Sequence, residues 1–281
     1  MGHGQTWITH FFPGYEQLNA YLQNTALGAK GLLFGNETVI VQHVIAAILV
    51  SLIILVVSIR ARMQLAAAGA DAIIPPPKAS LRNFIEYIFE GLYGLSKNII
   101  GPDAGRYFPV IAALAMFIFF SNILGLVPGF APPTDNWNTT FACGGFVFLY
   151  YNYHGIRAHG MGHIAHMANP VGEPWGWFLM PLLFPIEIVS HVARPFSLGV
   201  RLAANMMGDH AVLAAFLGLV PLLVPLPFMA LGLMVCMIQT LVFVLLTMIY
   251  IGLSVADTHN HDHEHEKDHA FTDTEQAELI A

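Results

Sequence analysis

The stretch WFLMPLLFPIEIVSHVARPFSLGVRLAANMMGDHAVLAAFLGLV, residues 177–220, decides the fold of this chain. It stays apolar for more than forty residues, roughly twice the length that one perpendicular crossing of a bilayer needs. Three prolines lie near its start, where a helix can kink or begin: Pro181, Pro185 and Pro195. After a short turn, a second over-long apolar stretch returns at residues 228–255. Because length beyond the bilayer thickness favours tilt, the two stretches predict a strongly tilted helical hairpin over residues 177–256.

Arg201 stands out within the first stretch because its charge is permanent. A guanidinium does not lose its proton in a protein. Placing it near the centre of a bilayer costs at least ~3 kcal/mol. Such a charge is retained where it has a task. We infer that Arg201 meets a carboxylate of another subunit and stops protons from leaking past it.

Six other polar side chains fall on the same helical face as Arg201. At ~100° per residue the face is about 100° wide, and it carries Glu187, Ser190, His191, Arg194, Asn205 and Asp209. One buried polar residue is usually an interhelical hydrogen bond, but a stripe with two arginines and two carboxylates predicts an ion pathway. On the returning stretch, a thinner row with Gln239 and Tyr250 is expected to face this stripe. His210 lies off the stripe and is expected to face other helices or a separate aqueous pocket.

Shorter apolar segments precede the hairpin and predict three further crossings. They are residues 39–58, residues 108–127 and residues 140–153, the last extended by Trp137 and a tyrosine cluster. Residues 81–100 mix apolar and charged side chains and predict an interfacial amphipathic helix instead. Asn122 lies in the last turns of the second crossing, and Asp135 lies in a short polar loop after it.

The basic residues predict the orientation of the chain in the membrane. One side collects Arg60, Arg62, Lys78, Arg82, Lys97, Arg106, Arg157 and Lys267, whereas only Lys30 falls on the other. The positive-inside rule then makes the first side cytoplasmic. The prediction is an external segment over residues 1–38, a membrane domain with about five crossings over residues 39–256, and a disordered acidic, His-rich cytoplasmic tail over residues 257–281.

Composition supports an all-α polytopic membrane protein. The chain is 56% hydrophobic and 10% charged, with a mean hydropathy of +0.62, whereas about a quarter of the residues of soluble domains are charged. Its net charge of −7 arises largely from the tail and argues against nucleic acid as a partner. Cys143 and Cys236 lie in apolar segments and are expected to be core residues rather than metal ligands.

Two stretches of the hairpin resemble subunit a of the F-type ATP synthase. The first is Ser190 with RPFSLGVRL at residues 194–202 and the following Asn205 and Met206, and the second is QTLVFVLLTMIY at residues 239–250. The second crossing, with Asn122 and Pro128, is also similar. The resemblance covers most of residues 108–255 and implies a membrane subunit that faces a rotating c-ring.

The resemblance implies roles for individual residues. Arg201 matches the arginine that faces the ring carboxylates, Asn205 and Gln239 match the polar pair flanking it, and Glu187 and Ser190 match the cytoplasmic access channel. His210 occupies an outer-channel position where some members have glutamate. Gly232 departs from the family, which often has an ionisable residue there. We expect Asp209 and His210 to replace that outer-channel pair, with room beside Gly232 for water or the imidazole.

The mechanism implied by the resemblance uses two offset half-channels separated by Arg201. The outer one is expected to be lined by Asp135, Asp209, His210, Asn122 and Gln239, and the cytoplasmic one by Glu187, Ser190, His191, Arg194 and Tyr250. The implied partners are the c-ring, the peripheral-stalk b subunits, the remaining subunits of the complex and membrane lipid. The implied location is a bacterial inner membrane, and the choice between proton and sodium stays open.

Other motifs carry less weight. The chain has no Gly-x-x-x-x-Gly-Lys-Ser/Thr loop, so we expect a non-catalytic subunit without a nucleotide or cofactor site. HEKDH at residues 265–269 matches a metalloprotease pattern, but it lies in a polar tail rather than on a buried helix, and no metal site is expected. A secondary cation/proton antiporter is the alternative function, although no internal repeat is visible. A non-conducting scaffold is a third possibility, against which the polar stripe argues.

Overall fold

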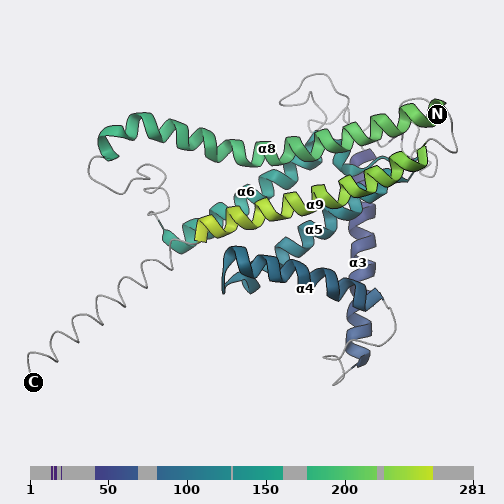
Figure 1. Cartoon of the computed structure of the whole chain (residues 1–281), viewed down its shortest axis with the longest axis horizontal. Coiled ribbons are helices and arrows are strands. Elements are labelled where there is room, and N and C mark those ends of the chain that lie inside the picture. Colours follow the sequence, from purple (N-terminus) through teal and green to yellow (C-terminus); the bar gives the residue numbers. More distant parts are fainter. Residues whose placement is uncertain are drawn as a thin grey trace, which may run out of the picture.

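The structure, a computed structural model, describes residues 14, 16, 17, 20, 42–68, 81–127, 129–160, 176–219 and 225–255. Over these residues it is all-helical, with six long helices and one 3₁₀ turn (Figure 1). Most of the expected external segment, all of the expected tail from residue 257, Lys30, Lys78 and Pro128 lie outside the described residues.

Helices α3 (Gln42–Ala68), α5 (Ala104–Leu126) and α9 (Pro225–Val255) coincide with three of the apolar segments that are expected to cross the membrane. Among the described residues, these are the helices that are both long and apolar enough to span a membrane. The expected end of the first crossing near residue 58 is wrong, because the helix continues to residue 68. The segment ARMQLAAA, residues 61–68, consists largely of strong helix formers, so the loss of hydropathy does not end the helix.

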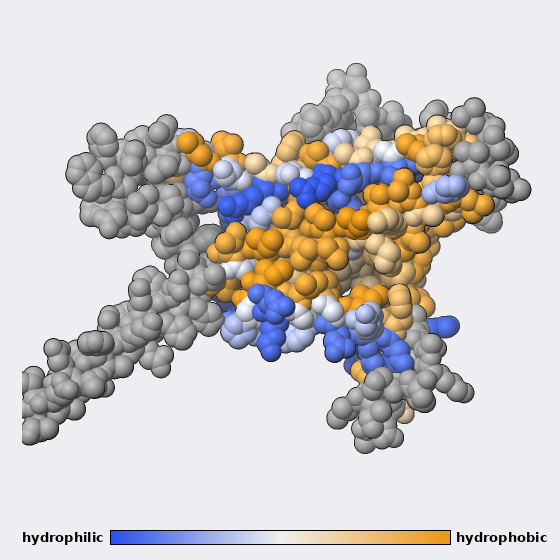
Figure 2. All heavy atoms as spheres, viewed as in Figure 1, coloured by the Kyte–Doolittle hydropathy of each residue, from blue (hydrophilic) through white to orange (hydrophobic). Residues whose placement is uncertain are grey.

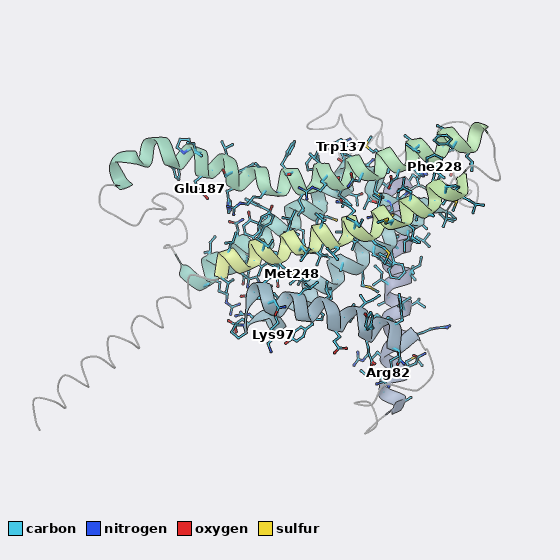
Figure 3. The ribbon with its side chains drawn as sticks, in the orientation of Figure 1. Arg82, Lys97, Trp137, Glu187, Phe228 and Met248 are labelled. Carbon is cyan, nitrogen blue, oxygen red and sulfur yellow. The ribbon has the colours of Figure 1, made fainter. Side chains whose placement is uncertain are left out.

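Helix α4 (Leu81–Ile100) has the bounds expected from sequence. It packs against α5 and α9. Glu90 and Lys97 are exposed, whereas Arg82 is buried and its Nε lies 2.7 Å from Glu86 Oε1. Hydrophilic side chains gather along the lower edge of the molecule, below a broad hydrophobic band (Figure 2). Arg82 and Lys97, which mark α4 in Figure 3, lie on this edge. The arrangement fits an amphipathic helix.

The segment between α5 and the next helix is more ordered than the polar loop expected there. It forms a 3₁₀ turn, η2 (Pro133–Asp135), followed by α6 (Trp137–His159). Thr134 is buried, and its hydroxyl donates a hydrogen bond of 2.9 Å to Asn122 Oδ1. The α6 helix has 23 residues and spans about 34 Å at ~1.5 Å per residue, so it exceeds the short third crossing of residues 140–153.

Helix α8 (Gly176–Leu219) runs without interruption for 44 residues, about 66 Å at ~1.5 Å per residue. Proline commonly kinks a helix or lies at its start. In α8, however, the helix continues through the three prolines of its first half. In Figure 1, α8 and α9 lie along the long axis of the molecule, and α3 crosses that direction steeply. The two long helices expected for the hairpin are therefore present and in contact, and the residues between them lie outside the described ones.

Glycines set the approach of α6 to α8. A Cβ on Gly144 would lie 2.7 Å from the backbone oxygen of Pro195, and one on Gly199 would lie 3.3 Å from the oxygen of Thr140. The backbones therefore approach as closely as small residues allow, as is usual between helices in membranes.

The core lies where α5, α6, α8 and α9 meet. Its buried members are Tyr107, Ile111, Ile118, Val147, Tyr151, Leu198, Leu202, Phe243, Val244, Met248, Ile251 and Val255. Because this cluster covers one side of α8 only, the other side of that helix remains open to solvent, lipid or a partner.

Candidate functional site

Arg201 lies on the open side of α8 and is exposed, although its neighbours Leu202 and Ala203 are buried. It forms no ion pair with any residue that the structure describes. A row of hydrophilic side chains runs along α8 in the same view (Figure 2). The permanent charge expected from the sequence is thus presented to the outside of this chain.

Between residues 190 and 208 the other exposed residues on this face of α8 are small, whereas Ile186 and Val212 are exposed on the same face beyond that stretch. The small residues are Ser190, Ala193, Ser197, Ala204 and Gly208, all within about 80° of Arg201 at ~100° per residue. Small side chains let a second helix approach closely in a membrane. We call this set, together with Arg201, the open stripe.

Asn205 and Gln239 join the two long helices next to Arg201. Asn205 Nδ2 donates a hydrogen bond of 2.6 Å to Gln239 Oε1. Gln239 is 3% exposed, and its Nε2 has no hydrogen-bond partner among the described residues. The contact between the polar stripe and the row on the returning helix, expected from sequence, is therefore present at this point.

His210 and Asp135 meet at the end of α8 that lies beyond Arg201. His210 Nδ1 lies 3.5 Å from Asp135 Oδ2, and His210 Nε2 lies 3.2 Å from the carbonyl oxygen of Phe130. A carbonyl only accepts hydrogen bonds, so Nε2 carries a hydrogen and Nδ1 faces the carboxylate. His210 thus faces other elements, as expected for a residue off the stripe.

A small cavity next to this pair contains Asn122 and Asp209. Its volume is about 10 Å³, close to that of one water probe. Its lining consists of Asn122, Gly125, Leu126, Pro132, Met206, Asp209, His210, Leu213 and Cys236. Asn122 is 1% exposed. Asn122 Nδ2 and Asp209 Oδ2 are buried and have no hydrogen-bond partner among the described residues. A donor and an acceptor thus line the same space.

The room expected beside Gly232 is not there. A Cβ on Gly232 would lie 2.7 Å from Leu126 Cδ2, so this leucine fills the space expected for water or for the imidazole. The expectation was wrong because the sequence does not show which side chain of α5 reaches α9 at this level.

Glu187 and Arg194 lie at the other end of α8. Arg194 Nη2 is 3.9 Å from Glu187 Oε1, and both side chains are about one-third exposed, at 31% and 35%. The Arg194 guanidinium carbon lies 5.7 Å from the centre of the Tyr250 ring, in cation–π range. Three of the expected cytoplasmic residues are therefore grouped. In Figure 3, Glu187 lies toward one end of the hairpin and Phe228 toward the other.

His191 contacts α6. It is buried, with Nε2 at 2.8 Å from Asn152 Oδ1 and at 3.3 Å from the Tyr151 hydroxyl. The polar residues expected on one face of α8 therefore do not all share one environment. Ser190 is exposed, whereas its neighbour His191 is covered by α6. The sequence interpretation missed Asn152 and Tyr151. The amide of Asn152, in an apolar helix, was the available signal.

Two polar clusters thus flank Arg201 along α8. Arg201 lies ten residues after His191 and nine before His210, about 15 Å and about 14 Å away at ~1.5 Å per residue. The fold and this arrangement define a polytopic helical membrane protein with an outward-facing cation between two polar clusters.

Sequence comparison gives the family. The profile of the ATP synthase A chain family matches residues 40–252. ATP synthase subunit a of Bdellovibrio bacteriovorus is 47% identical over 189 residues, 67% of this chain and 80% of its own length. The subunit of Sorangium cellulosum is 47% identical over 185 residues, 66% and 71% of the two chains. That of Geobacter sulfurreducens is 46% identical over 171 residues, 61% and 72%.

The chain belongs to the ATP synthase A chain family. This places it among the membrane subunits of the ATP synthase and confirms the resemblance found in its sequence. The antiporter alternative has no support from these comparisons.

Proposed function

We propose that this chain is the proton-translocating stator subunit of a rotary ATP synthase, with Arg201 facing the carboxylates of a c-ring. One observation carries the proposal. Arg201 is an exposed permanent cation in an apolar helix, and no described residue pairs with its charge. An intramembrane charge that no described residue of its own chain pairs points to a partner in another subunit.

The open stripe supports a helix as that partner. Apart from Arg201, it presents only serine, alanine and glycine, and a Cβ on Gly208 would meet nothing within 4 Å. A ring helix can therefore approach closely enough for its carboxylate to reach the guanidinium. A carboxylate facing lipid is neutral because burying its charge is costly, and it ionises beside Arg201 because an opposite charge favours the ionised form.

The outer half-channel would begin at Asp135 and His210. Next, one water in the cavity would accept a hydrogen bond from Asn122 Nδ2 and donate one to Asp209 Oδ2. The donor, the acceptor and the volume of about 10 Å³ fit this single water. Asn205 and Gln239 would continue the path toward Arg201. In this path Asp209 and His210 replace the outer-channel pair of the family, because Gly232 stands where the family often has the second ionisable residue.

The cytoplasmic half-channel would use Glu187, Ser190, His191, Arg194 and Tyr250. Glu187, Ser190, His191 and Arg194 lie on α8 on the other side of Arg201 from His210, and Tyr250 of α9 lies beside Arg194. The two clusters are separated along the helix. A proton would therefore pass from one to the other only while bound to a carboxylate of the rotating ring. Arg201 blocks the direct route, since a fixed positive charge repels protons.

The orientation completes the proposal. The chain would cross a bacterial inner membrane five times, with an external N-terminus, a cytoplasmic C-terminus and α4 at the cytoplasmic interface. The c-ring, the peripheral-stalk b subunits and lipid would surround it. The membrane potential then supplies ~2.3 kcal/mol per proton for each 100 mV, which the ring converts into rotation.

Cross-linking in the assembled complex tests the proposed ring contact. A photoactivatable reagent is attached to Ala204→Cys in a background without Cys143 and Cys236. Val192→Cys is the matched control, because Val192 is exposed on the same helix about 180° from Arg201 at ~100° per residue. We expect Ala204→Cys to link to the ring subunit and Val192→Cys not to. Ring links from Val192→Cys alone would refute the proposed face.

A further inference from the structure

An open apolar groove lies between α5 and α6. Both helices pack against α9 more extensively than against each other, so a space remains between them. The groove has a volume of about 350 Å³, and Ala113 and Phe146 are exposed in it. Its lining among the described residues consists of Pro109, Val110, Ala113, Leu114 and Phe117 of α5 and Phe146 of α6.

Two arginines lie beyond one end of this groove. Arg106 precedes Val110 by one turn on the same side of α5, and Arg157 lies near the end of α6. Both charges act on the His154 ring, so the two guanidinium groups belong to one basic cluster. Each arginine is exposed, and neither forms an ion pair with any described residue; Asp103, the acidic residue nearest to Arg106 in sequence, is exposed as well.

Aromatic side chains lie between the arginines and the groove. On α6, Phe146, Tyr150, Tyr153 and Arg157 follow one another at intervals of four, three and four residues, so they share one face of the helix. Phe146 stacks on Tyr150 with ring centres 6.0 Å apart, and the Tyr150 ring lies 4.6 Å from that of His154. Tyrosine collects at the level of lipid headgroups, because its ring is apolar and its hydroxyl is polar.

The order of these groups matches that of a phospholipid. The basic cluster, the tyrosines and the apolar groove correspond to the phosphate, the ester linkages and an acyl chain. From Arg106 to Phe117, α5 rises about 16 Å at ~1.5 Å per residue, which is close to one leaflet of a ~30 Å hydrocarbon core. A helix of that length and ~10 Å across would need about 1,200 Å³. The groove is much smaller, so it fits a single acyl chain rather than a helix of another subunit.

We propose that the groove between α5 and α6 binds one anionic phospholipid, with its phosphate held by Arg106 and Arg157 and an acyl chain along the groove. Guanidinium groups bind phosphate oxygens through paired hydrogen bonds. In the proposed orientation both arginines lie on the cytoplasmic side, where the membrane surface carries anionic lipids. The site involves neither the open stripe nor the two half-channels, so it goes beyond the proposed function.

Photolabelling of the purified complex tests the site. The complex is reconstituted with a phosphatidylglycerol that carries a photoactivatable group in one acyl chain, and the labelled residues are mapped by mass spectrometry. We expect label on the residues that line the groove. Unlabelled phosphatidylglycerol should compete for it, whereas phosphatidylcholine, which has no net charge, should not. Equal competition by the two lipids, or no label in the groove, would overturn the proposal.

Variants of the basic cluster test the headgroup contact. Arg106→Gln and Arg157→Gln should each lower labelling of the groove about fivefold, the effect of one basic residue at an anionic surface. Arg60→Gln with Arg62→Gln is the matched control, because both residues are exposed on α3 and are expected on the same side of the membrane. This control should leave labelling unchanged. Unchanged labelling in both variants of the cluster would show that the arginines do not hold the phosphate.

A second set of variants tests the apolar part of the site. Ala113→Trp places an indole in the groove, so labelling should fall with both arginines in place. Leu52→Trp, at an exposed position of α3, should not change it. Immunoblotting of the membranes confirms that both variants insert. Finally, a photoactivatable reagent on Ala113→Cys, in the background without Cys143 and Cys236, should link to lipid, and links to a helix of another subunit would refute lipid as the occupant.

Discussion

Asn205 Nδ2 donates a 2.6 Å hydrogen bond to Gln239 Oε1, and this bond joins the two long helices one turn from Arg201. Gln239 is buried, and its remaining amide hydrogens find no partner among the described residues. The pair therefore holds the region of the guanidinium in place and still offers a donor to a further group.

Loss of the hydrogen bond between Asn205 and Gln239 should lower coupled transport. Gln239→Leu leaves Asn205 Nδ2 without its acceptor, so we expect coupled transport to fall about tenfold, since an unsatisfied buried group costs ~1–3 kcal/mol. Asn205→Leu should have a similar effect. Because the two changes remove one bond, the double variant should be no worse than the worse single one. ATP-driven acidification of inverted vesicles measures all three, and strictly additive losses would show that the residues act independently.

Replacing Arg201 should uncouple the complex. Arg201→Ala removes the permanent charge of the open stripe, and we expect coupled transport to be abolished while the subunit still inserts. Arg201→Lys should largely fail as well, because an ammonium can lose its proton in an apolar site and lacks the planar fork. Near-normal acidification in Arg201→Lys vesicles would show that a fixed guanidinium is not required. Immunoblotting of the membranes confirms insertion.

The residues proposed for the outer half-channel should slow proton flow without uncoupling it. His210→Ala removes the group beside Asp135, and Asp209→Asn replaces the ionisable carboxyl group that lines the cavity by an amide that does not titrate. We expect each to reduce passive proton conduction severalfold, because each hydrogen bond of the path contributes ~1 kcal/mol. Conduction measured across pH in vesicles stripped of the soluble sector tests this. Wild-type rates and pH profiles in both variants would remove these residues from the pathway.

Two adjacent glycines give a matched test of the α6–α8 contact. A Cβ on Gly144 would lie 2.7 Å from the Pro195 oxygen, whereas one on Gly145 meets nothing within 4 Å. Gly144→Ala should therefore destabilise the subunit by ~1–3 kcal/mol, the usual effect of overpacking, and Gly145→Ala should not. Thermal unfolding of the purified complex compares them. Equal midpoints would mean that α6 moves away from α8 without loss.

Topology is tested by labelling. Asn136 caps α6, and its side chain accepts a hydrogen bond from Asn138 N. In the proposed orientation a cysteine at Asn136 reacts with an impermeant maleimide from outside, and a reporter fused after Ala281 is cytoplasmic. Reaction of the cysteine only in inverted vesicles would reverse the orientation.

The sequence by itself located the long helices, though not all of their ends, and most of the polar residues that the structure brings together. Hydropathy and charge predicted the bounds of α4, residues 81–100, without error. The helical period predicted that Asn205 faces the row of α9 that contains Gln239. These features depend on local propensity and on angles around one helix axis, which the order of residues specifies.

Only the tertiary structure decided which neighbour covers each sector of a helix. It placed Asn152 on His191, 39 residues away, Thr134 on Asn122, and Leu126 in the space beside Gly232. The helical period gives the direction of a side chain but not the element that stands there. That depends on close packing between distant segments, as where Gly144 lets α6 reach Pro195.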